Sequence, residues 1–152
     1  MNGLIRPELP KVGFLYRIKE FDINWVLDLF SQGDLNRHAN VSDLEEKIIV
    51  DGFTYLVKKG RPKYKLFKLN GPTCVQCGIT ANKCFMEMTV DVVNVAHFNF
   101  YNTLPGSKEI MITIDHIIPW SKGGVSRIDN YQVMCFECNT KKGTKMPKGV
   151  IV

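Results

Sequence analysis

The sequence lacks any apolar run long enough to cross a membrane, because no stretch of about 20 consecutive apolar residues occurs in it. The segment from Met1 to Pro7 also lacks the apolar core of a secretory signal. There is no internal repeat and no low-complexity tract. Hydrophobic residues make up 45% of the 152 residues and charged residues 23%, so a folded core can form. We therefore predict a folded cytoplasmic protein.

A disulfide framework is also excluded by the cysteines, which number five and accompany no secretory signal. Four of them form two Cys-x-x-Cys pairs, Cys74 with Cys77 and Cys135 with Cys138. Four thiolates in a tetrahedron are the preferred ligands of structural Zn²⁺. A redox motif would need one reactive pair near a βαβ pattern, which the sequence does not show. We therefore predict a zinc site that joins the ends of a long segment, with Cys84 as a buried small hydrophobe.

Positive charge is in modest excess, since the formal net charge is +5. An excess of this size favours polyanionic partners without specifying one. The basic residues are concentrated in two runs, from Lys58 to Lys68 and from Lys141 to Lys148. Such runs more often belong to a solvated face or a tail than to a binding site, so their meaning depends on what lies beside them.

The N-terminal half is predicted to contain two short helices and a basic β-hairpin. Apolar residues recur with helical spacing over residues 22–31, where Asp22 suits the cap, and a capping-box pattern predicts a second helix over 41–49. The hairpin is expected from strands at 53–58 and 64–69 around a turn with Gly60 and Pro62.

Farther along the chain, Gly71-Pro72 marks a boundary. It divides the chain into an N-terminal region, residues 1–70, and a C-terminal domain, residues 71–152. Val, Phe and alternating polar residues predict strands between 86 and 101 and over 109–114. The fold class is therefore predicted to be α+β.

An ordered set of motifs lies between the two cysteine pairs and just after them. It consists of Asp115-His116-Ile117-Ile118-Pro119, Lys122-Gly123-Gly124, Asp129-Asn130, and Cys138-Asn139-Thr140-Lys141-Lys142-Gly143. With the cysteine pairs, this set closely resembles the HNH endonuclease family, whose site is a ββα-metal hairpin and helix. The resemblance covers about half the chain, from Cys74 to Gly143. It implies a ββα-metal nuclease core with structural zinc, preceded by the small N-terminal region, and a helix that begins near Phe136.

The resemblance also implies roles for individual residues. His116 is expected to be the general base, Asp115 and Asn139 the ligands of a catalytic Mg²⁺ or Mn²⁺, and Asn130 the residue that fixes the loop holding His116. A histidine titrates near neutrality and suits proton removal from water, and a divalent ion offsets charge on phosphate. The implied activity is hydrolysis of DNA phosphodiester bonds to 3′-hydroxyl and 5′-phosphate ends.

Taken alone, Asp115-His116 would be interpreted as an aspartate at a strand end with a histidine bonded to a backbone carbonyl. The order of the surrounding motifs reverses that preference. His97 lies in an apolar strand and is interpreted as a core or face histidine, and His38 lies in a polar loop.

Beside such a site, the basic runs become expected DNA contacts. The residues concerned are Lys58, Lys59, Arg61, Lys63, Lys122, Lys141, Lys142 and Lys145. Two alternatives stay open, namely a noncatalytic zinc-stabilised module that binds nucleic acid and a zinc-stabilised module for protein interaction. Within the nuclease interpretation, a phage or mobile-element endonuclease, a restriction enzyme and a nicking enzyme all fit, and a phage-encoded enzyme would act in the host cytoplasm.

Overall fold

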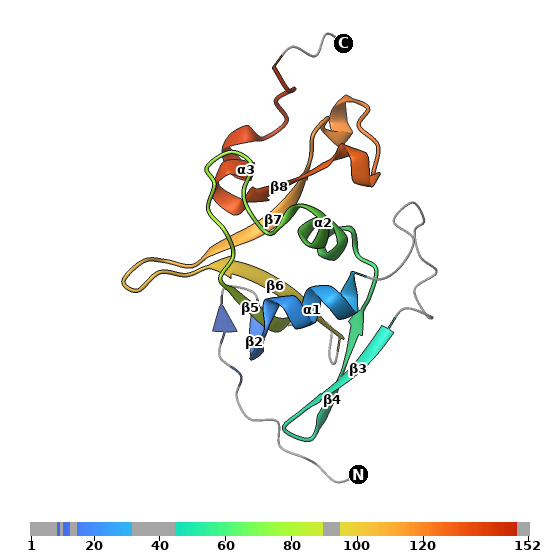
Figure 1. Cartoon of the computed structure of the whole chain (residues 1–152), viewed down its shortest axis with the longest axis vertical. Helices are drawn as coiled ribbons and strands as arrows, with labels where there is room; N and C mark the ends of the chain where they lie inside the picture. The colour runs from blue at the N-terminus through green and yellow to red at the C-terminus, as the bar shows by residue number, and fades with distance from the viewer. Residues whose placement is uncertain (1–8, 10, 13–14, 32–44, 90–94, 149–152) are drawn as a thin grey trace.

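The structure is a computed structural model that describes residues 9, 11–12, 15–31, 45–89 and 95–148, and a mixed sheet forms its centre (Figure 1). The strands are β1 (Lys11–Val12), β2 (Leu15–Phe21), β3 (Glu45–Val50), β4 (Phe53–Lys58), β5 (Lys83–Thr89), β6 (Val95–Asn102), β7 (Ile110–His116) and β8 (Tyr131–Cys135). The helices are α1 (Ile23–Phe30), α2 (Pro62–Asn70) and α3 (Phe136–Lys142), with short 3-10 helices at Trp120–Lys122 and Ile128–Asn130. The strand order is β1-β2-β5-β6-β4-β3, and β7 pairs with both β6 and β8.

Helices α1 and α2 cover one face of this sheet through aromatic contacts. Phe98 and Phe100 alternate along β6 and therefore point to the same face. The ring of Phe30 from α1 lies 4.9 Å from that of Phe98, and the ring of Phe67 from α2 lies 5.0 Å from that of Phe100. All four side chains are fully buried, and burial of such a side chain contributes about 1.5–3 kcal/mol.

The first predicted helix is confirmed as α1, and its predicted cap is correct, because Asp22 Oδ1 accepts a hydrogen bond from Trp25 N at 2.9 Å. The second predicted helix is wrong over residues 45–49, which belong to β3, while residues 41–44 and His38 lie outside the described residues. Asp51 and Gly52 have positive φ angles of 51° and 82° and join β3 directly to β4. An Asp-Gly pair is a strong signal for a two-residue hairpin turn, and it overrides the capping-box pattern.

The predicted basic hairpin is half correct. Its first strand is β4, but residues 64–69 belong to α2 rather than to a second strand. Pro62 stands at the start of this helix, where its missing N–H costs no hydrogen bond. Tyr64 and Phe67, three residues apart, share the helix face that is buried against β6. The hairpin in this region is β3 with β4.

The side of β6 that faces away from β5 is paired in two separate places. It pairs in parallel with β4 at Val95 and Ala96, and with β7 from Phe100 onward. Between them, the backbone of Phe98 bonds to side chains of α2: Lys63 Nζ donates to its carbonyl, and its N–H donates to Tyr64 Oη at 3.0 Å. Lys63 Nζ also donates to Asn99 Oδ1 at 3.1 Å. Two helix side chains thus replace a missing strand, and the ammonium of Lys63 is used inside the fold.

Burial, together with the nearby charge of Arg61, lowers the pKa of Lys63 to about 8. The unfolded chain, with an ordinary lysine pKa, therefore binds more protons than the folded chain between about pH 8 and pH 10. The free energy of unfolding should therefore rise with pH across that window. Its slope should be at most about 1.4 kcal/mol per pH unit, and the slope should be smaller than this because the side chain is only half-buried. In Lys63→Met this contribution should disappear. Urea unfolding of wild type and Lys63→Met at several pH values measures this contribution, and Lys122→Met is the exposed control. Equal slopes of unfolding free energy against pH for wild type and Lys63→Met would contradict the prediction.

The far end of the sheet has the order strand, strand, helix. Strands β7 and β8 pair antiparallel from Ile112 with Cys135 to His116 with Tyr131, and α3 begins at Phe136, as predicted. In Figure 1 this unit lies at the end of the molecule opposite β3 and β4.

The α+β class is confirmed, but the sheet is larger than the small core that was predicted. The β7–β8 pair continues through β6 and β5 into β2, which precedes Gly71 in sequence. Residues before and after Gly71 thus share one sheet, and the domain boundary at 70/71 stays a prediction. Among the described residues, no helix has the length and apolar character needed to span a membrane.

Candidate functional site

The four paired cysteines meet at the junction of β8 and α3. Their sulfur atoms all lie within 4.8 Å of one another, and Cys77 Sγ is 3.8 Å from Cys135 Sγ. Four sulfurs arranged around Zn²⁺ at 2.3 Å would be about 3.8 Å apart, so this spacing fits a tetrahedral ion. The described residues contain no other group of three or more His, Cys, Asp or Glu side chains placed to hold a metal.

Local backbone geometry places the first cysteine pair. Gly78, with a φ of 80°, turns the chain back so that its N–H donates to the carbonyl of Cys74 at 2.9 Å. Val75 N donates to Val133 O at 2.9 Å, which attaches this loop to β8. The loop is therefore docked on the strand that carries Cys135.

The thiol of Cys74 differs in its electrostatics from those of Cys135, Cys138 and the fifth cysteine, Cys84, whose pKa values burial raises. Burial alone would raise the pKa of Cys74, but backbone N–H groups of Cys135, Cys77 and Gln76 point to its sulfur and lower the pKa to about 6. A lowered pKa favours the thiolate that a metal binds. Cys84 is fully buried in β5, and burial raises its pKa, so its prediction as a small hydrophobe is confirmed.

Asp115 lies near the end of β7 with a cation already beside it. Its Oδ2 is 2.8 Å from Lys142 Nζ, and the two side chains are only 14% and 15% exposed. Gln132 Nε2 donates to the same oxygen at 3.2 Å, and Lys142 Nζ also donates to the carbonyl of His116 at 3.0 Å. The carboxylate of Asp115 is therefore compensated by the ammonium of Lys142 in this structure.

His116 is the last residue of β7, and its side chain contacts a different set of partners. Its Nε2 is 3.1 Å from Ser126 Oγ, and its ring lies 4.8 Å from the ring of Tyr131 on β8 at an angle of 57°. Successive strand residues point to opposite faces, which explains why Asp115 and His116 have separate neighbours. The ring is half-buried and held from two sides.

Asn130 ties together the loop that follows His116. Its Oδ1 accepts from Ile118 N at 2.9 Å, and its Nδ2 donates to Ile118 O at 3.1 Å and to Val125 O at 2.9 Å. The carbonyl of Asn130 also accepts from Ile117 N at 2.8 Å. The side chain is buried, so each of these bonds replaces a contact with water. The loop therefore has one fixed path between His116 and Ser126.

Gly124→Ala should disrupt this loop, because a Cβ at position 124 would lie 1.7 Å from Ile118 O and 3.0 Å from Asn130 Nδ2. Gly52→Ala is the matched control, since its Cβ would meet no atom within 4 Å and only its φ of 82° is unfavourable, at about 1 kcal/mol. We expect Gly124→Ala to lose distinctly more stability in urea unfolding than Gly52→Ala. Equal losses would mean that the loop adjusts freely.

Asn139 lies on α3 and contacts β7, but through a different residue from Asp115. Its Nδ2 is 3.4 Å from Thr113 Oγ1, and Thr113 Oγ1 donates to Met134 O at 2.9 Å. Thr113 and Asp115 are two residues apart and share a strand face, while Asn139 and Lys142 share a helix face. The amide of Asn139 and the carboxylate of Asp115 thus belong to one β7–α3 interface without a direct hydrogen bond.

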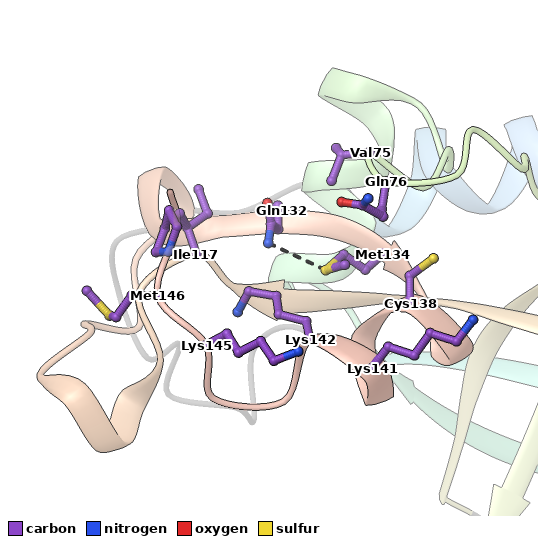
Figure 2. Close-up of a pocket in the computed structure, with 11 residues that line it drawn as sticks. Val75, Gln76, Ile117, Gln132, Met134, Cys138, Lys141, Lys142, Lys145 and Met146 are labelled. Atoms are coloured by element: carbon purple, nitrogen blue, oxygen red, sulfur yellow. Dashed lines mark hydrogen bonds between the residues drawn. The ribbon is translucent and has the colours of Figure 1, made fainter. Parts of the chain in front are cut away.

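The basic residues expected to contact DNA fall into separate places. Lys59 forms an ion pair with Glu46 at 2.6 Å, and Lys63 is used inside the fold. Lys58 and Arg61 lie near these two residues, between the end of β4 and the start of α2, whereas Lys122 is exposed on the loop after His116. Lys141, Lys142 and Lys145 line a pocket of about 450 Å³ beside α3 (Figure 2). Of these three lysines, Lys142 is the one that contacts Asp115.

Three contacts at the site escaped the sequence analysis. Gln132 reaches Asp115 because the β7–β8 register places them opposite each other, and Tyr131 reaches His116 for the same reason. Ser126 reaches His116 through the folded loop. Only the strand register could have indicated the first two, and no sequence signal indicates Ser126.

Residues 104–145 match the family model described as HNH endonuclease. The resemblance is therefore confirmed for this segment, which contains β7, β8 and α3, while Cys74 and Cys77 precede the matched residues. No curated protein and no solved structure matches the chain. The phage or mobile-element origin stays a prediction.

Proposed function

We propose that this HNH domain is a metal-dependent DNA endonuclease that hydrolyses phosphodiester bonds to 3′-hydroxyl and 5′-phosphate ends. The observation that carries the proposal is the arrangement at the end of the β7–β8 pair, inside the segment that matches the family. There the Asp115 carboxylate already faces a cation, and His116 begins a loop fixed by Asn130.

The cysteine cluster has a structural role in this proposal. Cys135 precedes α3 and its Sγ accepts from Cys138 N at 3.4 Å, so the metal-binding sulfurs also cap the helix. Asn139 follows Cys138 directly. Zn²⁺ in the cluster would therefore hold the helix that carries both Asn139 and Lys142.

Asp115 and Asn139 are the residues that would hold the second ion, Mg²⁺ or Mn²⁺. Such an ion, when bound, stabilises negative charge on the phosphate and on the departing oxygen. A carboxylate and an amide supply the oxygen ligands that Mg²⁺ prefers. Lys142 Nζ, which lies 2.8 Å from Asp115 Oδ2, would be available to bind the phosphate when Asp115 holds the ion.

His116 accepts the proton of the attacking water in this scheme. Tyr131 lies against its ring and Ser126 holds its Nε2, so the ring has a defined orientation before substrate binds. When Nε2 donates its hydrogen to Ser126 Oγ, the lone pair of Nδ1 is left to take the proton.

A plasmid assay tests the proposal. Supercoiled DNA is incubated with protein whose zinc content has been measured, with Mg²⁺, with Mn²⁺ or with neither ion. We expect nicked or linear DNA only when one of the ions is added, and we expect DNA ligase to reseal the products, because it requires 3′-hydroxyl and 5′-phosphate ends. DNA binding without cleavage under every ion would instead favour the noncatalytic zinc-stabilised module.

A further inference from the structure

We propose that the pocket between the first cysteine pair and α3 binds one unpaired nucleotide of the substrate strand, next to the bond that is cut. This inference rests on the proposed function and names the state of the substrate that the site accepts. None of the residues in Figure 2 belongs to the set assigned to proton transfer or to the second ion. The pocket is thus a neighbour of that site rather than part of it.

The first argument is position. Gln132 and Lys142 line the pocket, and both also bond to Asp115 Oδ2, at 3.2 Å and 2.8 Å. A phosphate beside Lys142 would therefore be adjacent to the carboxylate proposed to hold the second ion. A group in the pocket would be the nucleotide next to that phosphate.

The second argument is charge. Three lysines, Lys141, Lys142 and Lys145, line the pocket, and none of its 11 lining residues is acidic. The ammonium of Lys142 is shared with Asp115, whereas Lys141 and Lys145 are exposed and form no ion pair within 4.0 Å among the described residues. The charge of Lys141 also helps to lower the pKa of Glu137, which lies outside the pocket lining. Exposed ammonium groups that line a pocket without carboxylates favour an anion such as phosphate.

The third argument is the apolar wall. Figure 2 shows Val75 and Gln76 on the side opposite the lysines, with Met134 between them and Met146 at one end. Val75 is 64% exposed although it is apolar, and it comes from the loop that carries Cys74 and Cys77 and bonds to β8 through Val75 N. Apolar side chains offer a surface to the face of a base, and the Gln76 amide can bond to its edge.

Size and shape favour an unpaired nucleotide over a duplex. The volume of about 450 Å³ lies in the range of about 300–1,000 Å³ that is usual for small-molecule pockets. The walls come from the cysteine loop, β8, α3 and the segment at Met146 and Pro147. A base stacked inside a duplex cannot enter such a pocket, whereas a single-stranded or flipped base can.

Binding of short fluorescein-labelled single-stranded DNA to the zinc-loaded full chain tests the inference by anisotropy, without Mg²⁺ or Mn²⁺. Each position of the oligonucleotide is replaced in turn by an abasic analogue. We expect one abasic position to weaken binding by about five-fold or more, which is the lower end for loss of one stacked base. Val75→Glu should weaken binding of the intact strand and abolish this difference. Ile49→Glu is the matched control, since Ile49 is 70% exposed on β3, away from the pocket, and it should bind as wild type does.

Equal binding of all abasic strands, or equal affinity of Val75→Glu and Ile49→Glu, would overturn the inference. Because binding is measured without cleavage, the two proposals fail separately. A protein that shows the abasic effect but never cuts DNA would contradict only the nuclease proposal. A protein that cuts DNA but binds every abasic strand equally well would contradict only the proposal that the pocket binds a nucleotide.

Discussion

Replacement of His116 by alanine should lower the rate of DNA cleavage by about 10²–10⁴-fold, the usual contribution of a general base. The imidazole is the nitrogen base at the end of β7, and a histidine is the commonest general base in enzymes. Its contacts to Ser126 and Tyr131 involve no buried charge, so its removal should leave the fold and the cysteine cluster intact. Single-turnover cleavage of plasmid DNA with Mg²⁺ measures the rate, and zinc content and urea unfolding measure the fold.

His97→Asn is the matched control for this variant. His97 lies on β6 opposite Glu87, and burial together with Lys63 and Arg61 lowers its pKa to about 4, so it is neutral at the pH of the assay. As predicted, it is a histidine on a face of the sheet. His97→Asn should cleave DNA at the wild-type rate. Equal cleavage by wild type and His116→Ala would show that His116 is not the general base. The proposed site would then have no residue assigned to accept the proton of the attacking water.

Much of the fold could be predicted where one local signal dominates. Residues 22–31 have both helical spacing and a capping aspartate, and they form α1. Residues 45–49 and 64–69 carry competing signals, and the predictions for both segments are wrong. In each case a residue next to the segment in the chain determined the secondary structure. The Asp51-Gly52 turn makes β3 a hairpin partner, and Pro62 starts a helix that the rings of β6 then cover.

The candidate site shows the same division between local and long-range information. Cysteine spacing alone predicted a cluster, and the structure brings the four sulfurs together. The ion pair of Asp115 with Lys142 and the pocket beside it depend on how α3 packs against β7 and β8. A basic run could equally belong to a solvated tail, so only tertiary structure separates Lys142 from the internal Lys63.

Cys138→Ser should release zinc and unfold the end of the molecule formed by β8, α3 and the loop at Cys74. A bound structural Zn²⁺ contributes on the order of 10 kcal/mol in small zinc domains, which is comparable to the whole unfolding free energy of a typical domain. Apart from the cluster, α3 has few anchors, because none of its residues is fully buried. Zinc content should fall from one ion per chain toward none, and hydrogen exchange should show lost protection in α3 and in the Cys74 loop.

Cys84→Ala separates this effect from the mere loss of a thiol. Cys84 is fully buried in β5 and lies outside the cluster, so its removal leaves a small cavity and costs about 1 kcal/mol while zinc stays bound. Cys138→Ser should also abolish cleavage, since Asn139 and Lys142 would lose their positions along with the helix. This loss differs from that of His116→Ala, which keeps its zinc and its protected α3. If Cys138→Ser kept full zinc content and a protected helix, the cluster would not be the element that holds α3, and the proposed link between the two metal sites would fall.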